Sequence, residues 1–279
     1  RIVELSNSSR TENRAYYTSP SICFSLVQSL PKYKNNAEIN ILEPSVGSGS
    51  FLPHIFEHYR NCKRVNLDLI DIDENSIDIL KVLVSKIKVP SNFKLRFLVK
   101  DFLEHDIDRL YDVIIGNPPF GKVSKEYLKS INIHDPKKKS KNIFSFFLEK
   151  SIKISNHISF ISPKSLLSAP EFNQLRERIN EKNITFIHDH GEKGFDSDVK
   201  IETIGITIGG KASSKEIIIS SLINNETFEV KKEYIMDKNF PYWILYRNKY
   251  FDKTLRKLKL GVFDVFRDSQ ITKKITKKS

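Results

Sequence analysis

The sequence predicts a doubly wound α/β domain with a mostly parallel sheet, helices on both faces and a basic C-terminal extension. From Ile39 onward, short runs of β-branched residues alternate with amphipathic stretches of helical length. Strands that are separated by helices of this length pair in parallel and are covered on both sides. After Gly209 and Gly210 the alternation weakens and lysines accumulate, which indicates a boundary or a linker.

The expected elements follow this alternation along the chain. We expect strands over residues 39–43, 65–71, 93–100, 112–116, 157–162, 184–188 and 201–208. We expect helices over residues 19–30, 51–60, 74–88, 143–154 and 171–181. Pro20 suits the first turn of the leading helix, because a missing N–H costs nothing there. Residues 217–223 could form one more strand, whereas residues 224–279 show only weak periodicity.

Length and composition limit the class of protein. With 279 residues and 39% apolar side chains, the chain can bury one sizeable core and a smaller appendage. It has no apolar run of roughly 18 residues and no apolar signal segment, so we expect a cytoplasmic protein without a membrane partner. Cys23 and Cys62 lie far apart and in no metal-ligand spacing, so we expect core thiols rather than a disulfide or a zinc site.

The chain is strongly basic, with a net charge of +12 and an isoelectric point of about 9.4. Residues 211–279 carry 16 Lys and Arg residues against 8 Asp and Glu residues, so +8 of the charge lies in this segment. Such an excess favours a polyanionic partner such as nucleic acid, with a solvated basic surface as the alternative. The chain begins with an arginine and ends in a lysine-rich segment, and we expect a piece of a longer protein.

A glycine-containing segment from Glu43 to Leu52 follows the first expected strand and opens a helix. Gly47 and Gly49 would let the backbone approach a ligand closely, and the helix would supply free N–H groups. A nucleotide-like ligand could use this turn, but a tight turn without a ligand also uses glycines. No Gly-Lys-Ser/Thr follows, so the segment does not match the phosphate-binding P-loop.

Carboxylates stand at the ends of the next two strands. Asp71 ends the second strand, 24 residues beyond Gly47, where ribose hydroxyls are held in folds of this kind. Asp73 is expected to cap the following helix, and capping is also the structural alternative for Asp71. At the end of the third strand, Asp101 could accept a hydrogen bond from an adenine amine and Phe102 could pack against the ring. A plain helix cap is the alternative for Asp101.

The functional hypothesis depends on the segment Asn117, Pro118, Pro119 and Phe120. It follows an apolar strand, and the two prolines end that strand in a rigid turn. The Asn117 side-chain oxygen and the Pro118 carbonyl can therefore converge on one amine and aim its lone pair at an electrophile. Phe120 can stack on the flat face of a base that has left the duplex. The structural alternative is an ordinary turn at a strand end.

Together these motifs resemble the S-adenosylmethionine-dependent N6-adenine DNA methyltransferase family of restriction-modification systems, over roughly residues 14–210. The motif order is that of the group in which the cofactor motifs precede the catalytic motif and a target-recognition domain follows. The resemblance implies a Rossmann-like sheet, S-adenosylmethionine as cofactor and double-stranded DNA as substrate. The cofactor-binding residues that it implies are Tyr17, Thr18, Pro20, Glu43, Ser45, Gly47, Gly49, Asp71, Ile72, Asp101 and Phe102.

Some positions depart from the family pattern or match it loosely. Phe120 stands where many members have Tyr, which preserves stacking and removes a hydroxyl, and Asp71 stands where Glu is frequent. Phe195 falls where some members place a second aromatic side chain against the flipped base, and this match is loose. The triplet His188–His190 is interpreted as a strand-end cluster rather than a metal site, because no third ligand is near in sequence.

The resemblance implies site-specific methylation of adenine N6 in DNA, with residues 1–210 as the S-adenosylmethionine-binding catalytic domain. Residues 211–279 are expected to form a basic linker or the start of a truncated DNA target-recognition region. A cognate restriction endonuclease or a recognition domain outside this chain is a further expected partner. Two alternatives stay open: a methyltransferase of the same fold that acts on RNA or on a protein glutamine, and a catalytically silent DNA-binding module.

Overall fold

The computed structural model describes residues 18–131, 140–194, 201–210, 215–237 and 242–258. The chain divides into two compact units, Arg1–Ile244 and Leu245–Ser279. The described part of the second unit contains the helix α9 (Lys249–Leu255). Within the described ranges, no helix combines the length and the apolar composition that a membrane crossing requires.

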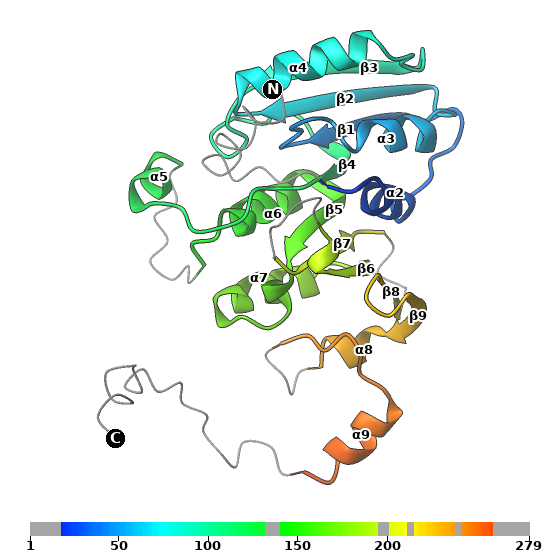
Figure 1. The fold of residues 1–279 in the computed structure, drawn as a ribbon, viewed down its shortest axis with the longest axis vertical. Coiled ribbons are helices and arrows are strands. Elements are labelled where there is room, and N and C mark those ends of the chain that lie inside the picture. Colours follow the sequence, from blue (N-terminus) through cyan, green and yellow to red (C-terminus); the bar gives the residue numbers. More distant parts are fainter. Residues whose placement is uncertain (1–17, 132–139, 195–200, 211–214, 238–241, 259–279) are drawn as a thin grey trace. The chain divides into compact units, whose positions relative to one another are not determined.

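Nine described strands of the first unit form one sheet in the order β3-β2-β1-β4-β5-β7-β6-β8-β9, which can be followed in Figure 1. The strands are β1 (Glu38–Glu43), β2 (Arg64–Asp71), β3 (Phe93–Val99), β4 (Tyr111–Gly116), β5 (Ser155–Pro163), β6 (Ile184–Gly191), β7 (Thr203–Ile208), β8 (Glu216–Ser221) and β9 (Glu226–Lys231). The strands from β3 to β5 pair in parallel. β7 is antiparallel to β5 and β6, β8 is parallel to β6, and β9 is antiparallel to β8.

The described helices connect these strands and pack on them. They are α2 (Pro20–Gln28), α3 (Leu52–His58), α4 (Glu74–Ser85), α5 (Lys125–Ser130), α6 (Ile143–Ile154), α7 (Asn173–Asn180) and α8 (Lys232–Ile235), with short 3-10 turns at η1 (Lys164–Leu167), η2 (Pro170–Phe172) and η3 (Glu192–Gly194). Helix α2 contacts α3 and the strands β5, β6 and β7. Helix α4 contacts β2 and β3, and α6 contacts β5.

The central strands are covered on both faces. Val113, Ile114 and Ile115 are consecutive in β4 and are all 0% exposed. Successive side chains of a strand point to opposite faces of the sheet, so burial of all three requires a covering layer on each face. This arrangement confirms the predicted doubly wound α/β fold with a mostly parallel sheet.

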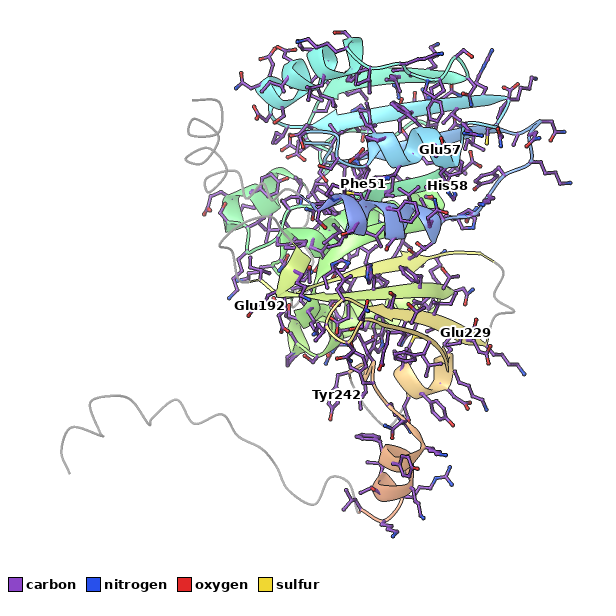
Figure 2. All side chains as sticks on the ribbon, turned by 45° about the vertical axis from the view of Figure 1, so that its right-hand side comes forward. Phe51, Glu57, His58, Glu192, Glu229 and Tyr242 are labelled. Carbon is purple, nitrogen blue, oxygen red and sulfur yellow. The ribbon has the colours of Figure 1, made fainter. Side chains whose placement is uncertain are left out.

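Close packing of α2 on the sheet depends on a small residue in β7. A Cβ at Gly205 would lie 2.4 Å from Leu26 Cδ2, so the bare glycine backbone provides the room that α2 occupies. Side chains fill the space between sheet and helices in Figure 2, where Phe51 at the start of α3 is buried. Cys23 and Cys62 are buried free thiols, as predicted.

The expected strands and helices are found from α2 to β8, with ends that differ by a few residues. The strand β9 and the short helix α5 were not predicted. In β9 only Val230 is buried and charged residues alternate with it, a pattern that suits an edge strand but has little apolar periodicity. The sheet therefore continues beyond Gly210, where the composition changes.

Gly209 and Gly210, which follow β7, offer a matched test of how closely the chain packs against β5 at this point. Gly209 has φ +130°, and a Cβ there would lie 2.2 Å from the Asn156 carbonyl oxygen, whereas Gly210 has φ +89° and no atom nearer than 3.8 Å. We expect Gly209→Ala to lower the free energy of unfolding by about 2–5 kcal/mol, because backbone strain and a backbone clash add. Gly210→Ala carries only the strain and should cost about 1–2 kcal/mol. Urea unfolding followed by circular dichroism measures both, and equal losses would contradict the expectation.

Candidate active site

The predicted site residues gather along one edge of the sheet. β3, β2, β1 and β4 are consecutive parallel neighbours, so their carboxyl ends face the same side. The loops that follow them, residues 44–51, 72–73, 100–110 and 117–124, leave the sheet at this edge. β1 and β4 lie next to each other although the chain leads from β1 to β2 and from β4 to β5. Open α/β sheets bind ligands at such a point, because the two loops diverge and leave a crevice.

The loop after β1 is attached to the end of β2. Gly47 and Gly49 have φ of +50° and +76°, a conformation that favours glycine. The Gly47 N–H donates to Asp71 Oδ2 at 2.7 Å, and the Val46 N–H donates to the Ile70 carbonyl at 2.9 Å. A Cβ at Gly49 would meet Leu80 Cδ1 at 2.5 Å, whereas a Cβ at Gly47 would meet no atom within 4 Å. Gly49 thus serves packing on α4, and Gly47 borders open space.

Glu43 is a buried carboxyl group that lacks a partner for one oxygen. It is 1% exposed, and its Oε2 accepts no hydrogen bond from the described residues. Burial first, and the charge of Asp71 second, raise the pKa of Glu43 well above its ordinary value. Such a group gains most from a cation, because a positive charge restores the lost solvation of the carboxylate. The ammonium group of a methionine moiety would meet this need, in agreement with the role that the sequence predicts for Glu43.

Asp71 and Ile72 stand at the end of β2 as the sequence predicted. Asp71 Oδ1 accepts from the Asp73 N–H at 3.0 Å, and Oδ2 accepts from Gly47, so the carboxylate position is fixed by backbone donors. Burial raises the pKa of Asp71. Each carboxylate oxygen has a further lone pair that a ribose hydroxyl can use. The Ile72 side chain is 66% exposed, which suits an apolar contact for a bound ring. Asp73 caps α4 by accepting from the Asn75 N–H, as expected.

Asp101 and Phe102 follow β3 in a compact turn. Asp101 Oδ1 accepts from the Leu103 N–H at 2.8 Å, so part of the capping alternative is realised although no helix follows. Asp101 Oδ2 accepts from the Tyr127 hydroxyl at 2.7 Å, and this bond adds to burial in raising the pKa of Tyr127. Phe102 is buried and contacts Phe147 of α6, with ring centroids 5.1 Å apart.

The segment Asn117–Phe120, which the sequence predicts to be catalytic and which is called the catalytic segment below, is held by residues from two other parts of the chain. Asn117 Nδ2 donates to Thr18 Oγ1 at 3.2 Å, and the Ser45 hydroxyl donates to the Asn117 carbonyl at 3.1 Å. Gly116 passes close to the first loop, since a Cβ there would lie 3.5 Å from Pro44 Cδ. The structure therefore brings three segments together at one point: Thr18 before α2, the loop of residues 44–51 (the predicted cofactor loop) and the catalytic segment.

The aromatic residue of the catalytic segment packs against α6. Phe120 is 7% exposed and meets Phe144 edge to face, with centroids 6.1 Å apart and planes at 78°. Asn142 caps α6 by accepting from the Phe144 N–H and also accepts from the Gly121 N–H at 3.3 Å. The start of α6 thus anchors the downstream end of the catalytic segment.

Two predicted residues, Tyr17 and Phe195, lie outside the described residues. Pro20 begins α2, where the sequence placed it. The triplet His188–His190 belongs to β6 and is buried, and its Asp189 forms an ion pair with Lys164 at 3.1 Å. In the described part of the chain, no group of three or more His, Cys, Asp or Glu residues could hold a metal ion.

Sequence analysis did not identify Tyr127 or Lys150, both of which contact the turn after β3. They lie 26 and up to 48 residues from their partners, so no short motif contains them. The spacing of apolar residues in α6 contained one indication that Lys150 faces the protein interior. It lies three residues after Phe147 and four before Ile154, which places a lysine on the helix face that carries buried aromatic side chains.

The fold is that of the class I methyltransferases. A putative class I S-adenosylmethionine-dependent methyltransferase from Listeria monocytogenes is similar with a TM-score of 0.57 and 18% identity, over 73% of this chain and 64% of the other. The modification subunit of a putative type I restriction enzyme from Vibrio vulnificus YJ016 is similar with a TM-score of 0.60 and 14% identity, over 91% of this chain and 55% of the other.

Residues 21–195 match the family described as Eco57I restriction-modification methylase, and the chain belongs to that family. Its cofactor is S-adenosylmethionine. The type II methyltransferase M.VspI from Vibrio sp. (strain 343) is 26% identical over 196 residues, which are 67% of this chain and 46% of the relative. The chain therefore spans about half the length of this curated relative.

The substitution Glu43→Gln separates the effect of the buried acid on folding stability from its effect on cofactor affinity. Because the folded-state pKa is raised, the acid lowers stability as the pH rises above its unfolded value of 4.5. We expect Glu43→Gln to raise the melting temperature of the cofactor-free protein, with a gain that grows from about pH 5 to pH 8. The same change should weaken S-adenosylmethionine binding about 10-fold or more, since a charged partner of the ammonium is lost.

The matched control is Glu57→Gln on α3, labelled in Figure 2, where the side chain is exposed and pairs with Arg60. Calorimetric titration and thermal unfolding across this pH range should show little change for the control. A pH-independent gain in Glu43→Gln would contradict the raised pKa, and unchanged cofactor affinity would remove Glu43 from the methionine site.

Proposed function

We propose that this chain is the cofactor-binding and catalytic part of a site-specific DNA methyltransferase that methylates N6 of an adenine flipped out of double-stranded DNA. The observation that carries the proposal is the hydrogen bond from Asn117 Nδ2 to Thr18 Oγ1. The bond sets the orientation of the amide, with Nδ2 as the donor end and Oδ1 as the acceptor end. A target amine needs acceptors, because both of its protons must be bound to expose the nitrogen lone pair.

The chemistry follows from how weakly an adenine amine attacks. Its lone pair is delocalised into the ring, and bound S-adenosylmethionine supplies an electrophilic methyl group on a positively charged sulfur. Asn117 Oδ1 and the Pro118 carbonyl each accept one N–H of the amine, which favours a tetrahedral nitrogen with its lone pair aimed at the methyl group. As the new N–C bond forms, the bond between the methyl carbon and the sulfonium sulfur would break, S-adenosylhomocysteine would leave as a neutral thioether, and the positive charge would pass to the nitrogen. Both acceptors stabilise that charge until a proton leaves to water.

The cofactor loop and the catalytic segment are held in a fixed relation. The Ser45 hydroxyl links the methionine-binding loop to the Asn117 backbone, and Gly116 lies beside Pro44 of the same loop. A shift of one loop therefore moves the other, so the acceptors and the methyl donor keep their relative placement. Such fixed placement is a large part of the rate gain in transfer between two substrates.

We assign stacking on the flipped base to Phe120, whose ring plane is fixed by Phe144. A base inside a duplex cannot reach this edge of the sheet, and stacking on an aromatic ring offsets part of the cost of unpairing, by about 1–3 kcal/mol per base. Phe195 is the second candidate for this contact.

The basic residues after position 210 support a DNA partner, since they can neutralise phosphates. We propose that residues 211–279 lead into a recognition region that belongs to the complete protein. A recognition domain outside this chain would select the DNA sequence to be methylated. A cognate restriction endonuclease would act on the same DNA sequence. Restriction-modification methylases form the family to which the chain belongs, and this supports the assignment.

The substrate class is tested with tritiated cofactor and separate DNA, RNA and protein substrates, using the complete protein that contains this chain. We expect label in DNA, and nuclease digestion followed by chromatography should identify N6-methyladenine. Label in RNA or on glutamine would identify one of the two rival methyltransferases. Cofactor binding without transfer to any of the three substrates would favour the silent binding module.

Asn117→Ala should lower the rate of methyl transfer by roughly 10²-fold or more, because one contact that holds the amine in the transition state is lost. Cofactor affinity should change little, since Asn117 acts on the substrate amine. Single-turnover kinetics and calorimetry measure the two quantities separately. Transfer within threefold of wild type by folded protein would remove Asn117 from the mechanism.

Thr18→Val tests the orienting role of the hydroxyl. The valine keeps the shape of threonine but cannot accept from Asn117 Nδ2, so the amide loses the contact that fixes its donor end. We expect the single-turnover rate to fall about 10-fold, as for the loss of a hydrogen bond worth about 1–1.5 kcal/mol. Thr18→Ser retains the hydroxyl and should stay near the wild-type rate. A Val variant as fast as the Ser variant would show that the hydroxyl does not orient Asn117.

A further inference from the structure

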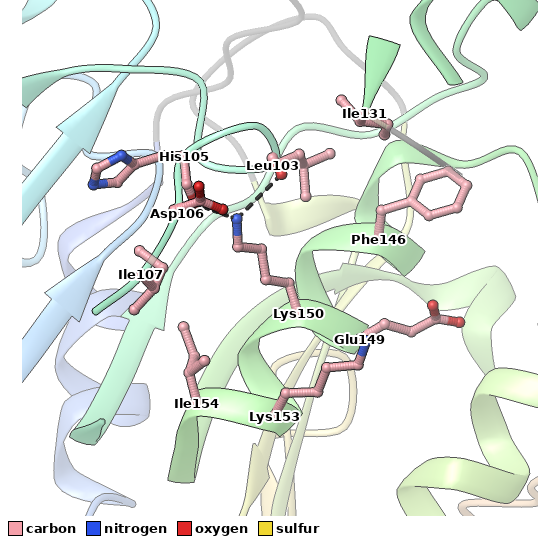
Figure 3. Close-up of a pocket in the computed structure, with 10 residues that line it drawn as sticks. All are labelled: Leu103, His105, Asp106, Ile107, Ile131, Phe146, Glu149, Lys150, Lys153 and Ile154. Atoms are coloured by element: carbon pink, nitrogen blue, oxygen red, sulfur yellow. Dashed lines mark hydrogen bonds between the residues drawn. The ribbon is translucent and has the colours of Figure 1, made fainter. Parts of the chain in front are cut away.

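Lys150 reaches from α6 to the turn that follows β3. Its ammonium Nζ donates to the carbonyls of Phe102 at 2.6 Å, Leu103 at 3.1 Å and His105 at 2.6 Å. A lysine ammonium has three N–H donors, and all three are used here by carbonyls of one short backbone segment. Nζ also lies 5.0 Å from the centroid of the Phe102 ring. Figure 3 shows the side chain rising from α6 towards Leu103.

The turn that Lys150 holds is the one that carries Asp101 and Phe102. Within it, the His105 N–H donates to the Asp101 carbonyl at 2.8 Å and the Leu103 N–H donates to Asp101 Oδ1 at 2.8 Å. The position of the Asp101 carboxylate therefore depends on the path of the backbone through Leu103 and His105. Lys150 fixes that path from outside the turn.

Side-chain packing supports this turn only in part. A cavity of about 340 Å³ lies beside it, lined by Leu103, His105, Ile107, Phe146, Lys150 and Lys153 (Figure 3). The turn follows β3, which among the described strands pairs with β2 only. Hydrogen bonds from Lys150 thus take the place of close packing on this side. Without a cation, three carbonyl dipoles that converge on one point would also repel one another.

We propose that Lys150 is a positioning residue for cofactor binding, which acts through the carbonyls of Phe102, Leu103 and His105 to hold Asp101 and Phe102 against the adenine ring. The proposal rests on the proposed assignment of Asp101 and Phe102 as the adenine contacts. It does not depend on which substrate receives the methyl group. Lys150 contacts the backbone carbonyls of the turn, so its proposed effect on the cofactor is indirect.

The experiment compares two ligands that differ at the adenine amine, S-adenosylhomocysteine and its deaminated hypoxanthine counterpart. Calorimetry on the whole chain gives both dissociation constants for wild type, Lys150→Met and Lys153→Met. Lys153 lines the same cavity from the same helix but is exposed, so its variant controls for the loss of one charge. Wild type should prefer the adenine ligand by about 10-fold or more, since only an amine donates to the Asp101 carboxylate.

We expect Lys150→Met to weaken binding of the adenine ligand by about 10-fold and to reduce the preference to within about threefold. Lys153→Met should leave both constants within about twofold of wild type. An equal loss for both ligands with the wild-type preference retained would overturn the proposal, because a purely structural role weakens both alike. Loss of preference in the Lys153 variant would also overturn it, since the effect would then belong to charge alone.

Lys150→Gln covers the case in which Lys150→Met does not fold, as judged by its melting temperature. Glutamine keeps two N–H donors for three carbonyls, so the preference should fall at least about threefold. A folded Gln variant with the wild-type preference would overturn the proposal. A wild-type protein that binds both ligands equally would remove the adenine assignment of Asp101 and with it this role of Lys150. The DNA methylation assay is independent of all these outcomes, so failure of the proposed function is recognised separately.

Discussion

The parallel pairing of β1 with β4 is the constraint on which the rest of the site depends. Leu42 lies opposite Ile114, so the strands end at the same edge and their loops leave it side by side. Gly116 lies beside the loop after β1, with Pro44 Cδ 3.5 Å from the position of a Cβ, and the Ser45 hydroxyl of that loop donates to the Asn117 carbonyl. The proposed cofactor and base sites meet here because two crossover connections diverge from adjacent strands.

This edge holds two acids at a cost to stability. Burial raises the pKa of both Glu43 and Asp71, and the charge of Asp71 raises the pKa of Glu43 further. Backbone N–H groups of Gly47 and Asp73 offset part of this cost at Asp71, whereas the described residues offer no such donor to Glu43 Oε2. In the proposed site, the cationic end of the cofactor would relieve the remaining cost, so that the bound state would recover stability which the cofactor-free protein gives up.

Residues outside the loops fix the positions of the loops themselves. Thr18 precedes the sheet and accepts a hydrogen bond from Asn117 after β4, whereas Tyr127 on α5 and Lys150 on α6 both donate to the turn after β3. Each bond joins segments that are distant in sequence, so the loops need little regular structure of their own. We therefore expect substitutions in those segments to affect the proposed site without contacting a ligand.

The sequence by itself determined the order of strands and helices, because apolar periodicity and the glycine and proline positions are local properties. It also located the acids at strand ends and the segment from Asn117 to Phe120. It did not predict β9, whose charged edge residues carry little pattern, or the contacts of Tyr127 and Lys150. Tertiary structure decided those contacts, because the orientation of a carboxylate or an amide depends on donors and acceptors that the fold brings from distant segments.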